Sequence, residues 1–265
     1  MRTALTIAGS DSGGGAGIQA DLKTFAAHGV YGTSAITAVT AQNTIGVTAL
    51  LALEADVVTA QIEAVAGDIA VHAVKVGMLA TAAIVEAVAA AIEELELPLV
   101  VVDPVLAAKG GERLLDADGV QMLRAELLPR SLVVTPNIPE AEALSGRTIR
   151  SLEDAREAAR RIQDLGASAV IITGGHAPGD EIVDLLFDGR GFTEWRMPRI
   201  ATKNTHGTGC TFASAVAANL ALGRTLIESG AAAQQYVAGA IRHALPIGRG
   251  HGPLDHFWQT RRQSR

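Results

Sequence analysis

Two glycine-rich segments in this chain have the composition of anion-binding turns. The first covers residues 9–17 (GSDSGGGAG) and the second covers residues 204–210 (NTHGTGC). Each leads into a predicted helix, whose first N–H groups lack intrahelical partners and lie at the positive end of the macrodipole. Because glycine lets a ligand approach the backbone closely, the two segments together predict one cleft that handles anions from both sides.

Further polar residues stand directly after predicted strands. They are Gln42, Gly77-Met78, Asp103, Asn137 and the Gly-Gly-His segment at 174–176. Open α/β sheets bind ligands at the carboxyl ends of their strands, so we expect these residues to meet in one crevice.

Two common phosphate-binding motifs do not account for the glycine segments. Neither segment has the lysine that a P-loop requires at its fixed offset. Residues 15–20 match G-x-G-x-x-A, but no Asp or Glu occurs between Asp21 and Glu54 to bind a ribose. We therefore interpret the dinucleotide-binding match as accidental.

Apolar runs and helical spacings predict alternating strands and helices that would position these residues. Strands are expected at residues 3–8, 33–40, 47–53, 72–76, 99–102, 132–135, 169–173, 182–187 and 192–197. Helices are expected at residues 18–26, 58–69, 84–95, 120–127, 152–165, 209–222 and 226–244, with Thr81 and Ser151 as N-caps. This order predicts an α/β fold with a mostly parallel sheet and helices on both faces. One domain is expected over residues 1–265, with 256–265 as a solvated basic tail.

Composition excludes several classes of function. The chain has 265 residues, of which 48% are hydrophobic and 3% aromatic, and its net charge is −6. An acidic protein lacks the basic surface that nucleic-acid binding needs, and no apolar run is long enough to span a membrane. The apolar run at residues 4–8 is too short for the core of a signal peptide. One cysteine allows no internal disulfide, so a cytoplasmic location is expected.

Eight segments along essentially the whole chain resemble the hydroxymethylpyrimidine/phosphomethylpyrimidine kinases of thiamin biosynthesis. They are residues 8–23, 40–44, 77–79, 103–105, 135–141, 174–176, 204–210 and 250–256. The resemblance implies a ribokinase-like fold, use of ATP and Mg²⁺, and a homodimer. It also implies phosphorylation of 4-amino-5-hydroxymethyl-2-methylpyrimidine, first to its monophosphate and then to its diphosphate.

The resemblance implies that Gln42 binds the pyrimidine, with Gly9, Met78 and Val105 around the ring and Asp21 at the same pocket. A 4-aminopyrimidine presents an N–H donor beside a ring-nitrogen acceptor, and one carboxamide can meet both. The residues alone also allow a simpler interpretation. In it, Gln42 closes a strand end, Asp21 favours a helix start, and Met78 and Val105 pack in the core.

Asn137 and Glu140 resemble the N-x-x-E motif of the superfamily, which implies that Glu140 holds Mg²⁺ near the phosphates through water. Asp103 is a second acidic candidate. Mg²⁺ keeps several waters and takes one or two carboxylates, so few acidic ligands are needed. Glu140 would equally suit the positive start of a helix.

The resemblance implies that Gly207, Gly209 and Cys210 form an anion hole for the transferred phosphoryl group. Most sugar kinases of the superfamily have a basic Asp where this chain has Cys210. A thiol at a helix N-terminus can have a lowered pKa and serve as the base. Cys210 could equally be an anion-hole member alone, or a small buried residue.

The implied ATP site comprises Asn137, Thr173, Gly175, Thr205, Thr208 and Lys109. Family members commonly carry lysine at the position of Thr173, so this chain lacks one ammonium there. Lys109, in a glycine-flanked loop, is the preferred replacement, and Lys203 is the other candidate.

Two other functions remain open from the sequence. A pyridoxal or pyridoxine kinase would accept a ring and hydroxymethyl group of similar size. A non-catalytic sensor of pyrimidines or nucleotides would fit the cysteine at 210 and the threonine at 173.

Overall fold

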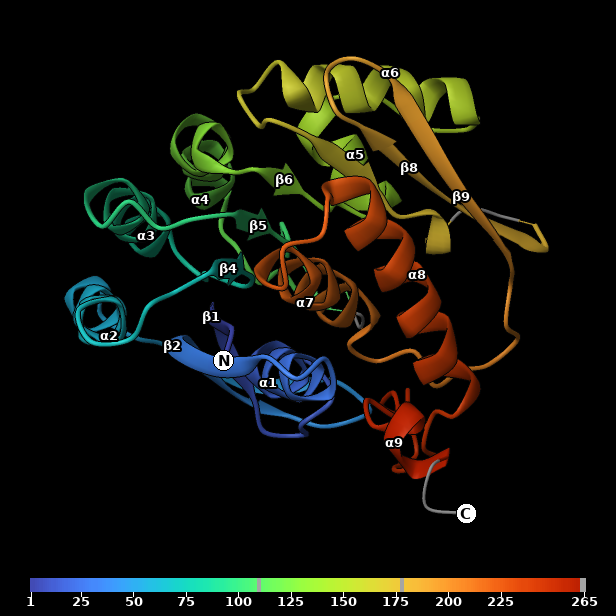
Figure 1. The fold of residues 1–265 in the computed structure, drawn as a ribbon, viewed down its shortest axis with the longest axis horizontal. Helices are drawn as coiled ribbons and strands as arrows, with labels where there is room; N and C mark the ends of the chain where they lie inside the picture. Colours follow the sequence, from blue (N-terminus) through green and yellow to red (C-terminus); the bar gives the residue numbers. More distant parts are fainter. Residues whose placement is uncertain (109–110, 177–178, 263–265) are drawn as a thin grey trace.

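The computed structural model describes residues 1–108, 111–176 and 179–262, and within these residues nine strands form one sheet. The order across the sheet is β3-β2-β1-β4-β5-β6-β7-β8-β9 (Figure 1). The strands are β1 (Thr3–Asp11), β2 (Tyr31–Gln42), β3 (Val47–Ala52), β4 (Ala73–Val76), β5 (Val100–Val102), β6 (Val133–Val134), β7 (Val170–Ile172), β8 (Glu181–Phe187) and β9 (Phe192–Pro198).

The central strands β2, β1, β4, β5, β6 and β7 pair in parallel, whereas β3, β8 and β9 pair antiparallel at the two edges. Short connections explain the antiparallel edges, because a parallel crossover needs a dozen or more residues. Only residues 43–46 join β2 to β3, and only 188–191 join β8 to β9. The predicted mostly parallel α/β sheet is confirmed.

Helices cover both faces of the sheet, as predicted. They are α1 (Gly17–Ala27), α2 (Ala55–Ala66), α3 (Ala82–Glu94), α4 (Ala117–Met122), α5 (Ile138–Ser145), α6 (Leu152–Gln163), α7 (Thr208–Ala221), α8 (Leu226–Arg242) and α9 (Trp258–Arg262). The core against α2 to α6 and the core against α1, α7 and α8 lie on opposite sides (Figure 1). Alternate residues of one strand serve the two cores: Val100 and Val102 face the first, and Val101 faces the second.

Local capping explains where several helices begin. Thr81 accepts a hydrogen bond from the Ile84 N–H at the start of α3, and Ser151 accepts one from the Asp154 N–H at the start of α6. Both caps were predicted, and each satisfies an N–H group that the helix leaves without a partner.

Several boundaries differ from the sequence prediction by a few residues, and α5 was not among the expected helices. Strand β1 does not end at Ala8, because Ser10 and Asp11 still pair with β2 beyond a register shift. The helix expected over 120–127 is α4 followed by a π-helical turn, and Pro129, which has no N–H, then lies in a 3-10 turn. The expected solvated tail instead begins with α9, whose Trp258 packs against the core under α8. No helix in the described part of the chain is long and apolar enough to cross a membrane.

Candidate active site

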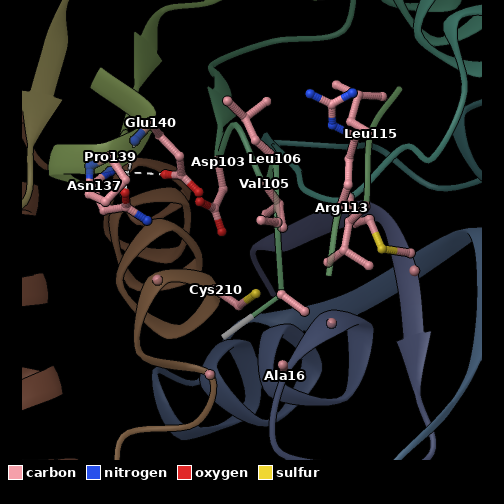
Figure 2. A pocket seen from close by; sticks show the side chains of 18 of the residues that line it. Ala16, Asp103, Val105, Leu106, Arg113, Leu115, Asn137, Pro139, Glu140 and Cys210 are labelled. Carbon is pink, nitrogen blue, oxygen red and sulfur yellow. Dashed lines mark hydrogen bonds between the residues drawn. The ribbon is translucent and has the colours of Figure 1, made fainter. Parts of the chain in front are cut away.

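A cavity of about 780 Å³ opens at the carboxyl ends of the parallel strands (Figure 2). The ends of β1 and β2 and the segments that follow β1, β4, β5, β6 and β7 contribute to its wall, together with the start of α7. The predicted meeting of polar strand-end residues is therefore confirmed for Gln42, Asp103 and Asn137, which all line this cavity.

The two glycine-rich segments meet at this cavity although they lie far apart in the sequence. Asp11 Oδ2 accepts hydrogen bonds from the N–H groups of Gly15 and Ala16, at 3.1 and 2.9 Å. The same oxygen lies 2.8 Å from His206 Nε2 of the second segment. Burial opposes the charge on Asp11, but the hydrogen bonds from His206 and the backbone outweigh it and keep the pKa of Asp11 below its usual value. An ionised Asp11 thus joins both turns.

Gly207 brings the second turn against the first and begins α7. Its φ of +83° lies in the left-handed region, and a Cβ there would fall 1.8 Å from the Gly15 carbonyl oxygen. Only glycine fits both conditions. Gly207, Thr208 and Gly209 all line the cavity at the helix start, where unpaired N–H groups and the positive dipole end favour an anion.

Cys210 lies at the same helix start, and Figure 2 shows its sulfur directed into the cavity on the side of Asp103. Of the roles left open by the sequence, the thiolate base requires a lowered pKa at Cys210. Desolvation raises the pKa of the Cys210 thiol to about 12, although the ammonium of Lys75 acts in the opposite direction. The thiol is therefore protonated at neutral pH.

Two buried carboxyl groups, Asp103 and Glu140, face each other across the upper part of the cavity (Figure 2). Burial raises the pKa of Asp103 to about 6, with Lys75 opposing and Asp21 adding to the shift. Burial and the nearby Asp103 raise the pKa of Glu140 to about 8. Asp103 Oδ2 is buried with no hydrogen-bond partner among the described residues.

This acidic pair fits a divalent cation, since an unpartnered buried carboxylate oxygen beside a second carboxyl group is the oxygen donor set that Mg²⁺ prefers. Among the described residues, no group of three or more His, Cys, Asp or Glu side chains could hold a metal alone. A cation held there would therefore complete its coordination with water and phosphate oxygens.

Asn137 fixes Glu140 through a reciprocal cap at the start of α5. Asn137 Oδ1 accepts from the Glu140 N–H at 3.0 Å, and Glu140 Oε2 accepts from the Asn137 N–H at 2.9 Å. This capping box satisfies two N–H groups, and the Leu106 backbone gives the Glu140 carboxylate a further hydrogen bond. A carboxylate has about four lone-pair sites, so these bonds do not use all of its acceptor capacity. The two interpretations of Glu140, a helix-start residue and a cation ligand, are thus compatible.

A buried ion pair beneath the cavity was missed in the sequence. Lys75 Nζ lies 2.9 Å from Asp21 Oδ2, and both side chains are fully buried. Asp21 also accepts hydrogen bonds from the hydroxyls of Thr6 and Ser214, each at 2.6 Å. Burial opposes the charge on Lys75, but Asp21 outweighs it and raises the pKa of Lys75 above its usual value. A lysine inside the apolar run of β4 was the available signal.

The residues expected around an aromatic ring lie on one wall, except for Asp21. Gly9, Gln42, Met78 and Val105 line the cavity. A Cβ at Gly9 would fall 2.3 Å from Met78 Cε, so this wall is closely packed. Asp21 does not line the cavity: its carboxylate is sequestered by Lys75.

Of the residues expected at an ATP site, Asn137, Thr173, Thr205 and Thr208 line the cavity. Gly175 and Lys203 do not line the described part of the cavity, and Lys109 lies outside the described residues. His176, from the Gly-Gly-His segment expected at the crevice, also lines the cavity. The wall further includes Arg113, which sequence reasoning missed because nothing in its local sequence distinguishes it from a surface position.

Comparisons with known proteins agree over nearly the full chain. The model of the phosphomethylpyrimidine kinase family matches residues 11–255. The hydroxymethylpyrimidine/phosphomethylpyrimidine kinase of Bacillus subtilis (strain 168) is 53% identical over 255 residues, which cover 96% of this chain and 94% of the relative. The thiamine biosynthesis bifunctional protein ThiED of Geobacter sulfurreducens is 53% identical over 253 residues. These cover 96% of this chain and 52% of that relative, so the chain spans about half of its length.

A solved structure of similar fold is the pyridoxal kinase from Staphylococcus aureus in complex with AMP-PCP and pyridoxal. Its TM-score is 0.90 at 37% sequence identity, and the match covers 98% of this chain and 95% of that chain.

Proposed function

The chain belongs to the phosphomethylpyrimidine kinase family, and we propose that it phosphorylates 4-amino-5-hydroxymethyl-2-methylpyrimidine in two ATP-dependent steps. The first step gives the monophosphate and the second gives the diphosphate for thiamin biosynthesis. The observation that carries this proposal is the shared cavity, which is lined both by the Gln42 carboxamide with the closely packed Gly9 and Met78 and by the start of α7. A ring held at that wall would present its hydroxymethyl oxygen to an anion site.

The acceptor wall supports an aminopyrimidine because Gln42 supplies a donor and an acceptor on one group. Thr40 Oγ1 donates to Gln42 Oε1 at 3.0 Å, which orients the carboxamide. Gly9 lets Met78 pack closely into this wall, since a Cβ at that position would fall 2.3 Å from Met78 Cε.

The N–H groups at the start of α7 would stabilise the transferred phosphoryl group. Charge develops on its equatorial oxygens in the transition state, and preorganised backbone donors bind this charge without reorganisation. Bound Mg²⁺ would supply charge neutralisation on the phosphates, with Asp103 and Glu140 as its protein ligands. Asn137, Thr173, Thr205 and Thr208 would contact ATP.

The raised pKa favours Cys210 as a neutral anion-hole member over a preformed thiolate base. In a loose phosphoryl transition state the acceptor oxygen keeps its proton until late, so a strong base is not needed early. The exposed Arg113 on the cavity wall is a described cation that would face the phosphates in place of the lysine missing at Thr173.

We also propose that residues 1–265 form one kinase domain that acts in the cytoplasm as a homodimer. Support for a dimer comes from the edge of the sheet, where Ile45, Leu50 and Leu51 are exposed on and beside β3. Edge strands with exposed apolar side chains favour association.

Pyridoxal is a second candidate acceptor, because a pyridoxal kinase of similar fold has been solved with pyridoxal and an ATP analogue. The deciding experiment measures ADP release from Mg·ATP with hydroxymethylpyrimidine, its monophosphate or pyridoxal. Gln42→Ala is compared with Gln163→Ala, a variant on helix α6 away from the cavity.

Turnover of both pyrimidines by the wild type, lost in Gln42→Ala and kept in Gln163→Ala, would support the two-step kinase. Turnover with pyridoxal alone would move the substrate to vitamin B6. Ligand binding with no ADP from any acceptor would overturn the kinase proposal in favour of a sensor.

A further inference from the structure

The C-terminal strap, defined here as residues 248–253, contains the Gly-His-Gly-Pro motif that the proposed mechanism does not use. It follows α8 and runs between two segments of the active site. One is the segment after Gln42 on the acceptor wall, and the other is the segment before Gly207 at the anion site.

The first half of the strap is hydrogen-bonded to Thr44. The His251 N–H donates to the Thr44 carbonyl oxygen at 2.8 Å, and the Gly250 N–H donates to Thr44 Oγ1 at 3.2 Å. Thr44 lies two residues beyond Gln42, so these bonds hold the end of the acceptor wall.

The second half of the strap is hydrogen-bonded to the approach to α7. The Gly252 N–H donates to Asn204 Oδ1 at 3.2 Å, and the His206 N–H donates to the Gly252 carbonyl oxygen at 3.1 Å. His251 Nδ1 also lies 2.9 Å from the Lys203 carbonyl oxygen. Gly207 follows His206 directly, and the His206 ring bonds to Asp11. The strap thus contacts the second glycine-rich turn directly and is linked to the first through His206.

Glycine is required at residues 250 and 252, because neighbouring atoms lie too close for a Cβ at either position. A Cβ at Gly250 would fall 1.9 Å from the Thr44 carbonyl oxygen, and a Cβ at Gly252 would fall 2.6 Å from Asn204 Oδ1. Neither residue has a positive φ, so alanine would be unstrained in its backbone and would act through the contact alone. Each glycine therefore sets how closely the strap approaches one of the two segments.

We propose that the C-terminal strap is a positioning element that fixes the acceptor wall relative to the anion hole. This inference rests on the proposed function. It assigns the distance between the bound acceptor and the transferred phosphoryl group to residues that contact neither of them. A displacement of about 1 Å between reacting groups can cost about 100-fold in rate. We therefore expect the first half of the strap to affect acceptor binding and the second half to affect the rate.

The first test compares Gly250→Ala and Gly252→Ala with Gly191→Ala, whose added Cβ would contact nothing within 4 Å. Gly250→Ala should raise KM for the hydroxymethylpyrimidine about tenfold and leave KM for ATP near its wild-type value. Gly252→Ala should lower kcat at least about tenfold with a smaller change in the acceptor KM. Gly191→Ala should keep all three constants.

The second test avoids added bulk. Asn204→Ala removes the acceptor of the Gly252 N–H, whereas Asn204→Asp keeps an acceptor oxygen and should restore kcat. Iodoacetamide alkylation of Cys210, the one cysteine of the chain, reports on the start of α7 without any substrate. Asn204→Ala and Gly252→Ala should change this alkylation rate at least about threefold, and Asn204→Asp should not.

Wild-type kinetic constants in Gly250→Ala, Gly252→Ala and Asn204→Ala, with wild-type alkylation rates in the last two, would overturn the positioning role. So would equal losses in every constant that follow a lowered melting temperature, because these indicate general destabilisation. If the wild type turns over no acceptor, the proposed function fails, and the alkylation rates still decide whether the strap positions α7.

Discussion

Cys210 combines a helix start, which favours a thiolate, with a desolvated setting, which favours the thiol. Desolvation prevails, and the pKa of Cys210 rises to about 12. The local sequence predicts only the effect of the helix start, because a cysteine after Gly-Thr-Gly indicates the start of a helix. The second depends on distant residues that close the cavity, so it could not be predicted from the sequence.

The raised pKa predicts how Cys210 reacts. Because the thiolate is the nucleophile, the iodoacetamide rate of native protein should rise about tenfold per pH unit from pH 7 to 9, with no plateau. Alkylation rates at each pH, measured by mass spectrometry of samples quenched at set times, would check this pH dependence. A plateau below pH 8 would show a lowered pKa and restore Cys210 as a thiolate base.

Glu140 predicts a pH dependence of stability in metal-free protein. Its folded pKa of about 8 lies above its usual 4.5, so the folded state binds more protons between these values. This contribution is complete below about 4.5 and is lost as the pH rises through about 8. Raising the pH from 6 to 8.5 in EDTA should lower the unfolding free energy by at most about 1.4 kcal/mol per unit.

Glu140→Gln keeps the capping oxygen and removes the titration, so its urea-unfolding curves should depend less on pH. Added Mg²⁺ should stabilise the wild type at pH 8.5 more than Glu140→Gln. Parallel pH profiles for the two proteins would contradict the assignment.

Lys75 and Asp21 predict a large loss of stability when one partner is removed. Lys75→Met should cost about 3–5 kcal/mol in urea unfolding, because the Asp21 charge is left buried without its cation. The double variant Lys75→Met with Asp21→Asn should recover much of this loss. A cost below about 1 kcal/mol for Lys75→Met, similar to exposed Lys203→Met, would count against a buried charge pair.

At the scale of elements, most strands and helices could be predicted, because apolar runs and caps such as Thr81 are local signals. For the two glycine-rich turns, the sequence predicted a shared crevice but not the direct contact between them. Its atoms, Asp11 on His206 and Gly207 on Gly15, come from residues about 195 positions apart. Such contacts depend on the order of strands in the sheet, which sequence spacing does not determine.

The contact of Gly207 with the first turn predicts a selective loss of activity. Gly207→Ala and Gly223→Ala both place alanine at a positive φ, and this strain costs each about 1–2 kcal/mol. Only the alanine at 207 would also push against the Gly15 carbonyl. Gly207→Ala should therefore lose at least about 100-fold in kcat, while Gly223→Ala keeps near wild-type kcat. Comparable rates in the two variants would mean that the turns need not touch.

At the scale of the whole molecule, antiparallel strands form both edges of a sheet whose centre is parallel. The two edges differ in the polarity of their exposed side chains. On the β9 side charged pairs such as Arg196 with Glu181 cover the sheet. On the β3 side, Leu51 is 67% exposed and Ile45 is 62% exposed. The sequence predicted these strands, but it predicted neither that they form the edges nor which edge would remain apolar, because both depend on the final order of strands.

The apolar edge predicts that association depends on β3. Leu51→Lys should shift the protein from dimer to monomer in analytical ultracentrifugation, because a charge would enter the proposed interface. Ile227→Lys, at an exposed apolar position on α8, should leave the dimer intact. A Leu51→Lys dimer of unchanged dissociation constant would exclude this edge as the interface.

The strap also has a consequence for biosynthesis. A growing polypeptide emerges from the ribosome amino end first, and its early elements can fold while later ones are still being made. Here the first glycine-rich turn arises within the first 17 residues, yet His206 and Thr44 receive their bonds from residues 250–252. The nascent chain therefore holds an unfinished pocket until residues 250–252 have been made. Ribosome-stalled chains that end before residue 250 should bind acceptor weakly, and competence should arrive abruptly once residues 250–252 have emerged.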